Sequence, residues 1–114
     1  MRTKVTLQPS STFVPVDLSK KNRFQFDCSA TSDPSTPVTV HWYKVLDQGR
    51  RELVYNEPPY LSVMNGNLTL YTDANCSDTC YKHLGEYICI ADNKYTQDNV
   101  TVRLNSTAGE HNYF

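Results

Sequence analysis

Two cysteines and a histidine have the spacing best suited to metal or redox chemistry. Cys76, Cys80 and His83 follow one another as C-x3-C-x2-H, and His111 is a possible fourth ligand. Thiolate and imidazole groups at such spacing can hold Zn²⁺. Three interpretations therefore stand for Cys76 and Cys80: a local disulfide, a bond to another chain, or a zinc site in a small metalloenzyme. The even total of four cysteines favours the local disulfide.

The other side chains offer no catalytic arrangement. The three histidines, His41, His83 and His111, are all expected on the surface. They are accompanied by no nucleophile motif, glycine-rich phosphate loop or paired carboxylates. We therefore expect a protein that is not an enzyme and that uses no cofactor or metal.

The charge balance argues against two classes of partner. Eleven Lys and Arg residues stand against twelve Asp and Glu residues, which gives a formal net charge of −1. The basic run at 20–23 is interpreted as a solvated turn, and no basic stripe is present to neutralise phosphates. No segment approaches the roughly 20 apolar residues needed to cross a bilayer. Neither nucleic-acid binding nor direct membrane insertion is expected.

Four N-glycosylation sequons indicate the secretory pathway. They begin at Asn67, Asn75, Asn99 and Asn105. Together with the even number of cysteines, they predict an extracellular glycoprotein, either at the cell surface or secreted. The first residues do not form a secretory signal, so we expect this chain to be a fragment of a larger protein.

Short segments of alternating polarity, separated by turn residues, predict an all-β chain without a helix of useful length. Strands are expected at 5–7, 12–14, 23–30, 38–45, 52–55, 60–64, 67–71, 85–92 and 99–104. The pair Asn65-Gly66 predicts a tight hairpin turn. A chain of 114 residues fits a single domain, which we place at 1–107, with a flexible C-terminal tail at 108–114.

The alternation also predicts which side chains point inward. The expected core consists of Phe24, Phe26, Cys28, Val40, Trp42, Leu68, Leu70, Tyr87, Cys89, Ala91, Val100, Val102 and Leu104.

The aromatic residues near two of the cysteines indicate a fold. Trp42 follows Cys28 by fourteen residues, and Tyr87 precedes Cys89 by two. This pattern resembles the immunoglobulin domain, which implies a two-sheet Greek-key sandwich. The resemblance also implies a Cys28–Cys89 disulfide between the sheets, packed against the indole. Closing that loop of roughly 60 residues would contribute roughly 4 kcal/mol to stability.

Longer motifs resemble the intermediate-type (I-set) immunoglobulin domains of adhesion molecules and receptors. The run 85–93, GEYICIADN, carries most of this likeness. Residues 33–38 resemble the L1, neuroglian and neurofascin group, whereas residues 59–63 resemble the membrane-proximal domain of fibroblast growth factor receptors. The chain departs from the family at His83, where an Asp is usual, and in a longer segment before Cys89 that holds Cys76 and Cys80.

Strand parity gives the functional prediction. If Tyr87 and Cys89 point inward, then Ile88 and Ile90 point outward on the sheet that contains Trp42. The expected neighbours on this partner-binding face are His41, Tyr43 and Arg103, with Tyr55 and Tyr95 near its edges. Apolar and aromatic side chains on a sheet surface are typical of a protein-binding site. A glycan on Asn99 beside this face would mask part of it.

We therefore expect a non-catalytic immunoglobulin-like module for cell adhesion or cell-surface recognition. Its partner would be another cell-surface or secreted protein, bound homophilically or heterophilically. The alternative is a growth-factor- or hormone-binding domain of a receptor or secreted binding protein.

Overall fold

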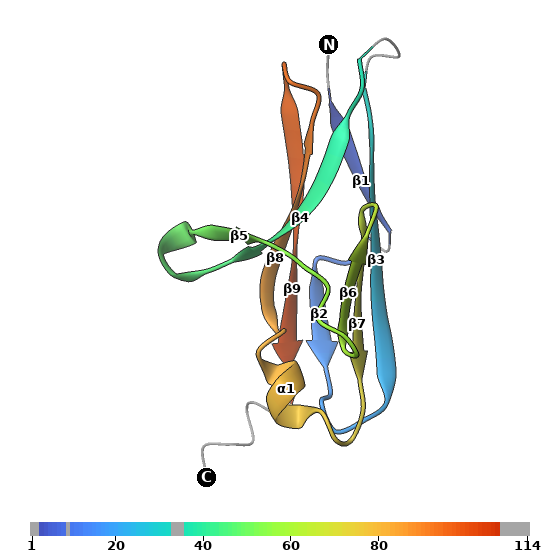
Figure 1. Ribbon diagram of the computed structural model, residues 1–114, viewed down its shortest axis with the longest axis vertical. Helices are drawn as coiled ribbons and strands as arrows, with labels where there is room; N and C mark the ends of the chain where they lie inside the picture. The colour runs from blue at the N-terminus through green and yellow to red at the C-terminus, as the bar shows by residue number, and fades with distance from the viewer. Residues whose placement is uncertain (1–2, 9, 33–35, 108–114) are drawn as a thin grey trace.

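The predicted two-sheet sandwich is confirmed by a computed structural model, which describes residues 3–8, 10–32 and 36–107 (Figure 1). The four-stranded sheet has the order β1 (Lys4–Gln8), β3 (Asn22–Thr31), β7 (Asn67–Thr72) and β6 (Leu61–Met64). The five-stranded sheet has the order β2 (Phe13–Val16), β9 (Gln97–Ser106), β8 (Gly85–Asp92), β4 (Thr39–Val45) and β5 (Arg51–Leu53).

The chain changes sheets between its first two strands. β1 pairs with β3 in one sheet, and β2 then pairs with β9 in the other. The β2–β9 pair is parallel, whereas the other strand pairs in the described residues are antiparallel. β2 lies at the edge of its sheet and contains Pro15, which has no N–H to offer. Proline at such an edge discourages further strand pairing.

The centre of the core is the predicted disulfide with its aromatic cover. Cys28 on β3 is bonded to Cys89 on β8, and Trp42 from β4 is 1% exposed. The indole Nε1 donates a hydrogen bond of 2.7 Å to the Gly66 carbonyl oxygen. Burial therefore leaves this polar group satisfied. The predicted inward positions are confirmed on β3, β4, β7, β8 and β9, with Phe24, Val40 and Val100 packed only partly buried against the core.

The hairpin turn between β6 and β7 has the predicted conformation. Asn65 and Gly66 have φ values of 51° and 87°, as a type I′ turn requires. The Gly66 carbonyl also accepts a hydrogen bond of 2.9 Å from the backbone N–H of Cys28. A Cβ atom at position 66 would lie 2.3 Å from the Cys28 carbonyl oxygen. Both the backbone angle and the available space therefore require glycine here.

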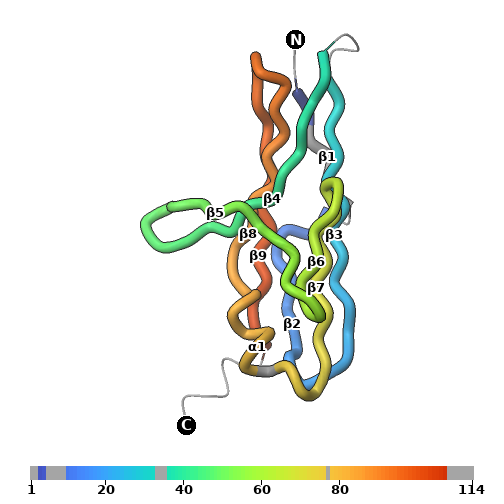
Figure 2. Tube along the Cα trace, in the orientation of Figure 1, coloured from blue at the N-terminus to red at the C-terminus, as the bar shows by residue number. Residues whose placement is uncertain are grey.

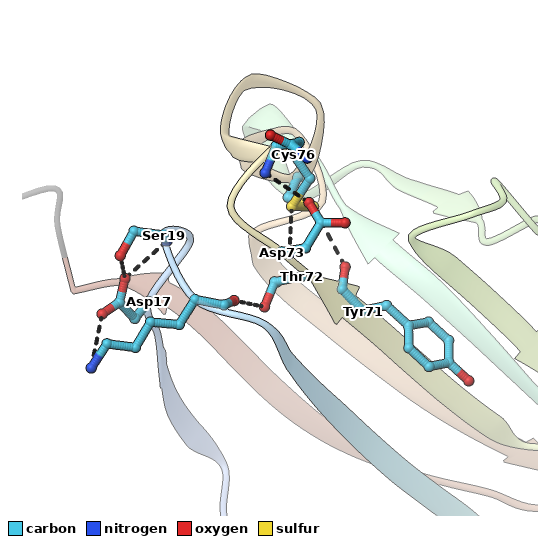
Figure 3. Close-up of a disulfide and its surroundings, with 9 residues drawn as sticks. Asp17, Ser19, Tyr71, Thr72, Asp73 and Cys76 are labelled. Carbon is cyan, nitrogen blue, oxygen red and sulfur yellow. Dashed lines mark hydrogen bonds and ion pairs between the residues drawn. A yellow bond between two sulfur atoms is a disulfide. The ribbon is translucent and has the colours of Figure 1, made fainter.

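The expectation of no helix is wrong for one segment between β7 and β8. Helix α1 (Ser77–Tyr81) begins directly after Cys76 and contains Cys80, and these two cysteines are disulfide-bonded. Residues four apart lie on the same face of a helical turn, which brings the two sulfur atoms together. Figure 3 shows Cys76 beside the end of β7, where its sulfur accepts the backbone N–H of Asp73 at 3.3 Å. The disulfide and the local backbone bonds thus hold a helix too short for periodicity to reveal.

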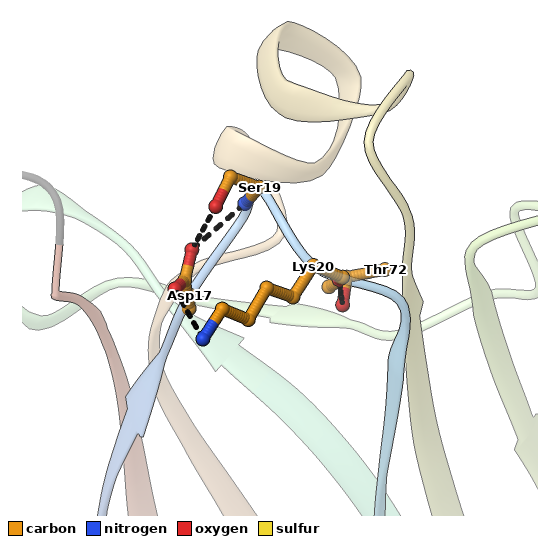
Figure 4. A network of polar contacts seen from close by, with 4 residues as sticks. All are labelled: Asp17, Ser19, Lys20 and Thr72. Carbon is orange, nitrogen blue, oxygen red and sulfur yellow. Dashed lines mark hydrogen bonds and ion pairs between the residues drawn. The ribbon is translucent and has the colours of Figure 1, made fainter.

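The turn between β2 and β3 lies next to this end of β7. Thr72 donates its hydroxyl to the Lys20 carbonyl oxygen at 2.8 Å (Figure 4). Within the turn, Asp17 accepts hydrogen bonds from the Ser19 hydroxyl and backbone N–H at 2.6 and 2.9 Å. These bonds lower the pKa of Asp17, with a smaller contribution from nearby Lys20. The residues of the basic run at 20–23 are all exposed, but only Lys20 and Lys21 precede the strand, since β3 begins at Asn22.

The turn between β8 and β9 lies at the opposite end of the sandwich (Figure 2). It is organised around Asn93. This buried side chain accepts hydrogen bonds from the backbone N–H groups of Tyr95 and Thr96 at 2.9 and 2.7 Å. It also donates to the Ser32 hydroxyl at 2.7 Å. Thr96 in turn accepts the backbone N–H of Thr3 at 3.0 Å. Asn93 and Thr96 together therefore link the β8–β9 turn to Ser32 and to Thr3.

Two features complete the description. The hairpin of β4 and β5, closed by the short 3-10 turn η1 (Asp47–Gly49), projects sideways from the sandwich (Figures 1 and 2). In the described part of the chain, no helix has the length and hydrophobicity needed to span a bilayer. The expected tail at 108–114, which includes His111, lies outside the described residues.

Candidate interaction face

Strand register defines an outer face, which we take as the outward surface of the five-stranded sheet. One row across it contains Thr101, Ile88, Tyr43 and Leu53, from β9, β8, β4 and β5 respectively. The next row contains Asn99, Ile90 and His41. Residues opposite one another on antiparallel strands share a face, so the structure brings together four of the predicted residues: His41, Tyr43, Ile88 and Ile90.

The exposure of the two isoleucines differs from the expectation. Ile90 is half-buried, but Ile88 is only 5% exposed although it points away from the core. Ile88 lies between Tyr43 and Thr101 in the middle of the sheet, where neighbouring strands flank it on both sides. Strand parity predicts the direction in which a side chain points. The extent to which neighbouring strands cover that side chain depends on the assembled sheet. The accessible part of the face is therefore Tyr43, Leu53, Ile90 and exposed His41.

The β2 side of the outer face is charged and aromatic. Arg103 on β9 forms an ion pair of 2.9 Å with Glu86 on β8. Phe13 lies opposite Arg103 on β2 and is exposed. Exposed ion pairs contribute little stability, typically below about 1 kcal/mol. Here the pair neutralises both charges beside the apolar row, and the predicted residue Arg103 is part of the face.

The two tyrosines expected near the edges of the face lie outside its strands, Tyr95 in the β8–β9 turn and Tyr55 two residues after Leu53 of the edge strand β5. Tyr95 is 71% exposed in the β8–β9 turn and lines a hollow of about 410 Å³ with Pro37 and Thr39. Tyr55 is 67% exposed and lines a different cavity, of about 230 Å³, near α1. Tyr55 shares that cavity with Tyr87, whose side chain points into the core. Leu53 of the outer face lines the same cavity, so the placement of Tyr55 near the edge of this face stays a prediction.

A polar cluster surrounds this second cavity. Lys44 donates from Nζ to the Lys82 carbonyl oxygen at 3.1 Å, and its ammonium lies 4.7 Å from the centre of the Tyr87 ring. Lys82 forms an ion pair of 3.2 Å with Glu57. Partial burial lowers the pKa of Lys44, an effect that Glu57 and then Glu52 oppose. These contacts bind β4 to the segment around α1 and leave both cations already engaged.

His83 is buried, at 3% exposed, and not on the surface as expected. Its backbone carbonyl accepts the hydroxyl proton of Tyr87. Because this bond uses the backbone, it does not depend on the side chain at position 83. Burial lowers the pKa of His83, while Glu57 opposes the shift. Burial likewise raises the pKa of the Tyr87 hydroxyl.

The structure removes two of the proposed zinc ligands. The sulfur atoms of Cys76 and Cys80 are bonded to each other, so neither thiolate is free to bind metal while the bond is intact. Within residues 3–8, 10–32 and 36–107, no three His, Cys, Asp or Glu side chains converge as a ligand group. The Cys76, Cys80 and His83 spacing therefore describes a disulfide-clamped turn that ends in a buried histidine.

The four sequons fall on different surfaces. Asn99 and Asn105 occupy outward positions on β9, because the intervening Val102 and Leu104 are buried in the core. Asn67 begins β7 in the four-stranded sheet, and Asn75 precedes α1. Glycosylation at these positions stays a prediction.

Sequence reasoning missed several members of the outer face. Leu53, Phe13 and Glu86 lie on it because strand pairing places them beside Tyr43 and Arg103. The alternation within 52–55 was a signal for Leu53. The position of Phe13 follows from the change of sheet after β1, which alternation does not reveal.

Comparisons with solved structures agree with this architecture. A structure of the N-terminal four Ig domains of Dscam1 isoform 6.9 is 25% identical, with a TM-score of 0.63, over 92% of this chain and 24% of that chain. A second, titled as the structural basis for Dscam isoform specificity, is 20% identical with a TM-score of 0.58, over 93% of this chain and 25% of that one. A third, the N-terminal eight Ig domains of Down Syndrome Cell Adhesion Molecule, is 22% identical with a TM-score of 0.59. It covers 91% of this chain and 14% of that chain.

The described chain spans about a quarter or less of the length of these structures. No protein-family model and no curated protein sequence matches it. The I-set subtype and the likeness to L1, neurofascin or fibroblast growth factor receptors stay predictions. The two sheets, their connecting disulfide and the solved neighbours together show that this chain has an immunoglobulin-like β-sandwich fold.

Proposed function

We propose that this domain is a non-catalytic extracellular recognition module of a cell-surface or secreted glycoprotein. It acts by binding another protein, either a second copy or a different cell-surface or secreted molecule. The observation that carries the proposal is the row of Ile88, Tyr43 and Leu53 on the outer face, in which Tyr43 and Leu53 keep part of their surface exposed. Large aromatic and aliphatic side chains of this kind anchor protein interfaces.

Two further observations support an adhesion role. The similar structure at 25% identity contains Ig domains of Dscam1, and a related one is titled a cell adhesion molecule. The two disulfides suit an oxidising, extracellular compartment. The growth-factor-binding alternative stays a prediction.

The test substitutes the accessible residues of the face. We expect Tyr43→Lys to weaken self-association, or binding to cells that display the partner, by at least about tenfold. Met64→Lys is the matched control, because Met64 is exposed on β6 of the opposite sheet. Bead aggregation with the coated domain measures homophilic contact, and flow cytometry on receptor-displaying cells measures heterophilic contact. Binding that survives Tyr43→Lys unchanged would overturn the proposal. Ile88 is unsuitable for this test, because a charge at a buried position would unfold the chain.

A further inference from the structure

The outer face carries one of the chain's own sequons in its second row. Asn99 is exposed on β9 and lies opposite Ile90 of β8. Ile90 in turn lies opposite His41 of β4. Thr101, which completes the sequon, lies opposite Ile88. Alternate residues of a strand share one side of a sheet, so the whole recognition element of this sequon points out of the outer face.

The Asn99 side chain is the one best placed to carry a large group over Ile90, because Asn105, which also points outward from β9, pairs with Pro15 of β2 near the other end of the strand. Among the described residues, none forms a hydrogen bond to its side-chain amide. Asn67 differs, because its side-chain oxygen accepts the Thr69 hydroxyl at 2.7 Å on the opposite sheet. Asn75 lies beside the disulfide-bonded Cys76, away from both sheet faces. A glycan on Asn99 would therefore stand directly beside a half-buried isoleucine.

We propose that Asn99 carries an N-linked glycan whose first sugars lie over Ile90 and His41. In its attachment, the amide nitrogen of Asn99 bonds to C1 of a lipid-diphosphate oligosaccharide. The bond from C1 to the diphosphate breaks, and the amide releases one proton. The apolar faces of the sugar rings then cover Ile90, which reduces its contact with water.

The glycan divides the outer face into two parts. The row that contains Asn99, Ile90 and His41 is occupied by the chain's own carbohydrate. The neighbouring row, with Tyr43 and Leu53, stays open because Asn99 does not belong to it. The projecting β4–β5 hairpin continues this open part away from the sandwich (Figure 1). This division rests on the proposed function, since it names the half of the face that a protein partner contacts.

Chemical labelling of histidine tests the covering without any partner. The glycoprotein is secreted from eukaryotic cells, and glycopeptide mass spectrometry reports whether Asn99 is occupied. Diethyl pyrocarbonate then labels His41, which is exposed in the protein chain alone, while buried His83 serves as the internal control. We expect His41 to react several-fold faster in Asn99→Gln than in the wild type. Asn67→Gln, which removes a sequon from the other sheet, should leave the rate unchanged.

Each outcome decides the proposal. An unoccupied Asn99, or equal His41 rates with and without its glycan, overturns it. Enzymatic removal of glycans from the folded wild type replaces the variant if Asn99→Gln is not secreted. A shielded His41 combined with unchanged binding by Tyr43→Lys would uphold the glycan and overturn the proposed function, so the two failures are distinguishable.

Discussion

The centre of the sandwich and the end that carries α1 each contain a disulfide, but the two bonds act on different scales. Cys28 and Cys89 are 61 positions apart and join the two sheets. Cys76 and Cys80 are four apart and clamp a single turn. The chain-entropy estimate for closing a loop is about 4 kcal/mol for the first and about 2 kcal/mol for the second.

The surroundings of the two bonds differ as well. The central bond is packed among Trp42, Phe26, Leu68 and other buried apolar side chains. Cys76 and Cys80 are buried at the end of the same core, and this end adds polar contacts, such as Tyr87 to the His83 carbonyl and Lys44 to the Lys82 carbonyl. The comparison indicates that the centre determines global stability, whereas the α1 end determines local order.

Removal of the central disulfide should have the largest effect. We expect Cys28→Ala combined with Cys89→Ala to lower the free energy of unfolding by about 4 kcal/mol, because the unfolded chain regains the freedom of a long loop. Guanidinium denaturation followed by Trp42 fluorescence measures the change. A loss no greater than that caused by removing the second disulfide would contradict the distinction between the two regions.

The close contact at Gly66 should have the next largest effect. Gly66→Ala places a methyl group against the Cys28 carbonyl oxygen at a positive φ, which should cost about 3 kcal/mol. Gly49→Ala is the matched control, because Gly49 also has a positive φ but no atom lies within 4 Å of its added Cβ. The difference between their urea midpoints isolates the contact, and equal losses would show that only the backbone angle matters.

Removal of the second disulfide should have a smaller, local effect. For Cys76→Ala with Cys80→Ala, we expect a loss of about 2 kcal/mol from closure of the short loop. Hydrogen exchange should accelerate in α1 while protection in β3 and β8 persists. Uniform loss of protection across both sheets would show that this end is coupled to the core more tightly than proposed.

The smallest effect should come from protonation of His83. Its folded-state pKa lies below the unfolded value near 6.5, so the unfolded chain binds more protons below that pH. The stability from the neutral buried imidazole is fully present above about pH 6.5 and is lost as the pH falls toward the folded-state pKa. The free energy of unfolding should therefore decrease between pH 7 and pH 5.

The pH dependence has a direct control. Thermal unfolding of His83→Gln should show a weaker decrease over that interval, since glutamine does not titrate. His41→Gln is the matched control, because it replaces an exposed histidine with the same side chain. Identical pH profiles for the wild type and His83→Gln would assign the dependence to other groups.

Much of the fold was predictable because its determinants are local or follow a two-residue period. Alternation located the strands and the inward positions of Phe26, Trp42 and Cys89, and Asn65-Gly66 specified its turn by conformational preference alone. The short helix was not predictable, since five residues are too few to show helical periodicity. Its existence depends on the disulfide and on the Tyr87 hydroxyl that holds the following turn.

The candidate face was predictable in direction but not in extent. Strand alternation correctly predicted that the side chains of Ile88 and Ile90 point away from the core. It did not reveal that Ile88 is covered by its lateral neighbours, or that Leu53 and Tyr55 line a cavity shared with Tyr87. Both outcomes depend on which strands become neighbours, and strands adjacent in a sheet are often distant in sequence.

The sequence by itself determined the strands, the tight hairpin, and the sequon that places Asn99 and Thr101 on one side of β9. These features follow from side-chain alternation and from backbone preferences of single residues. The tertiary structure alone decided the burial of His83, the coverage of Ile88 and the position of Asn99 opposite Ile90 and His41. Burial and cross-strand contact are properties of surfaces that meet only when the two sheets assemble.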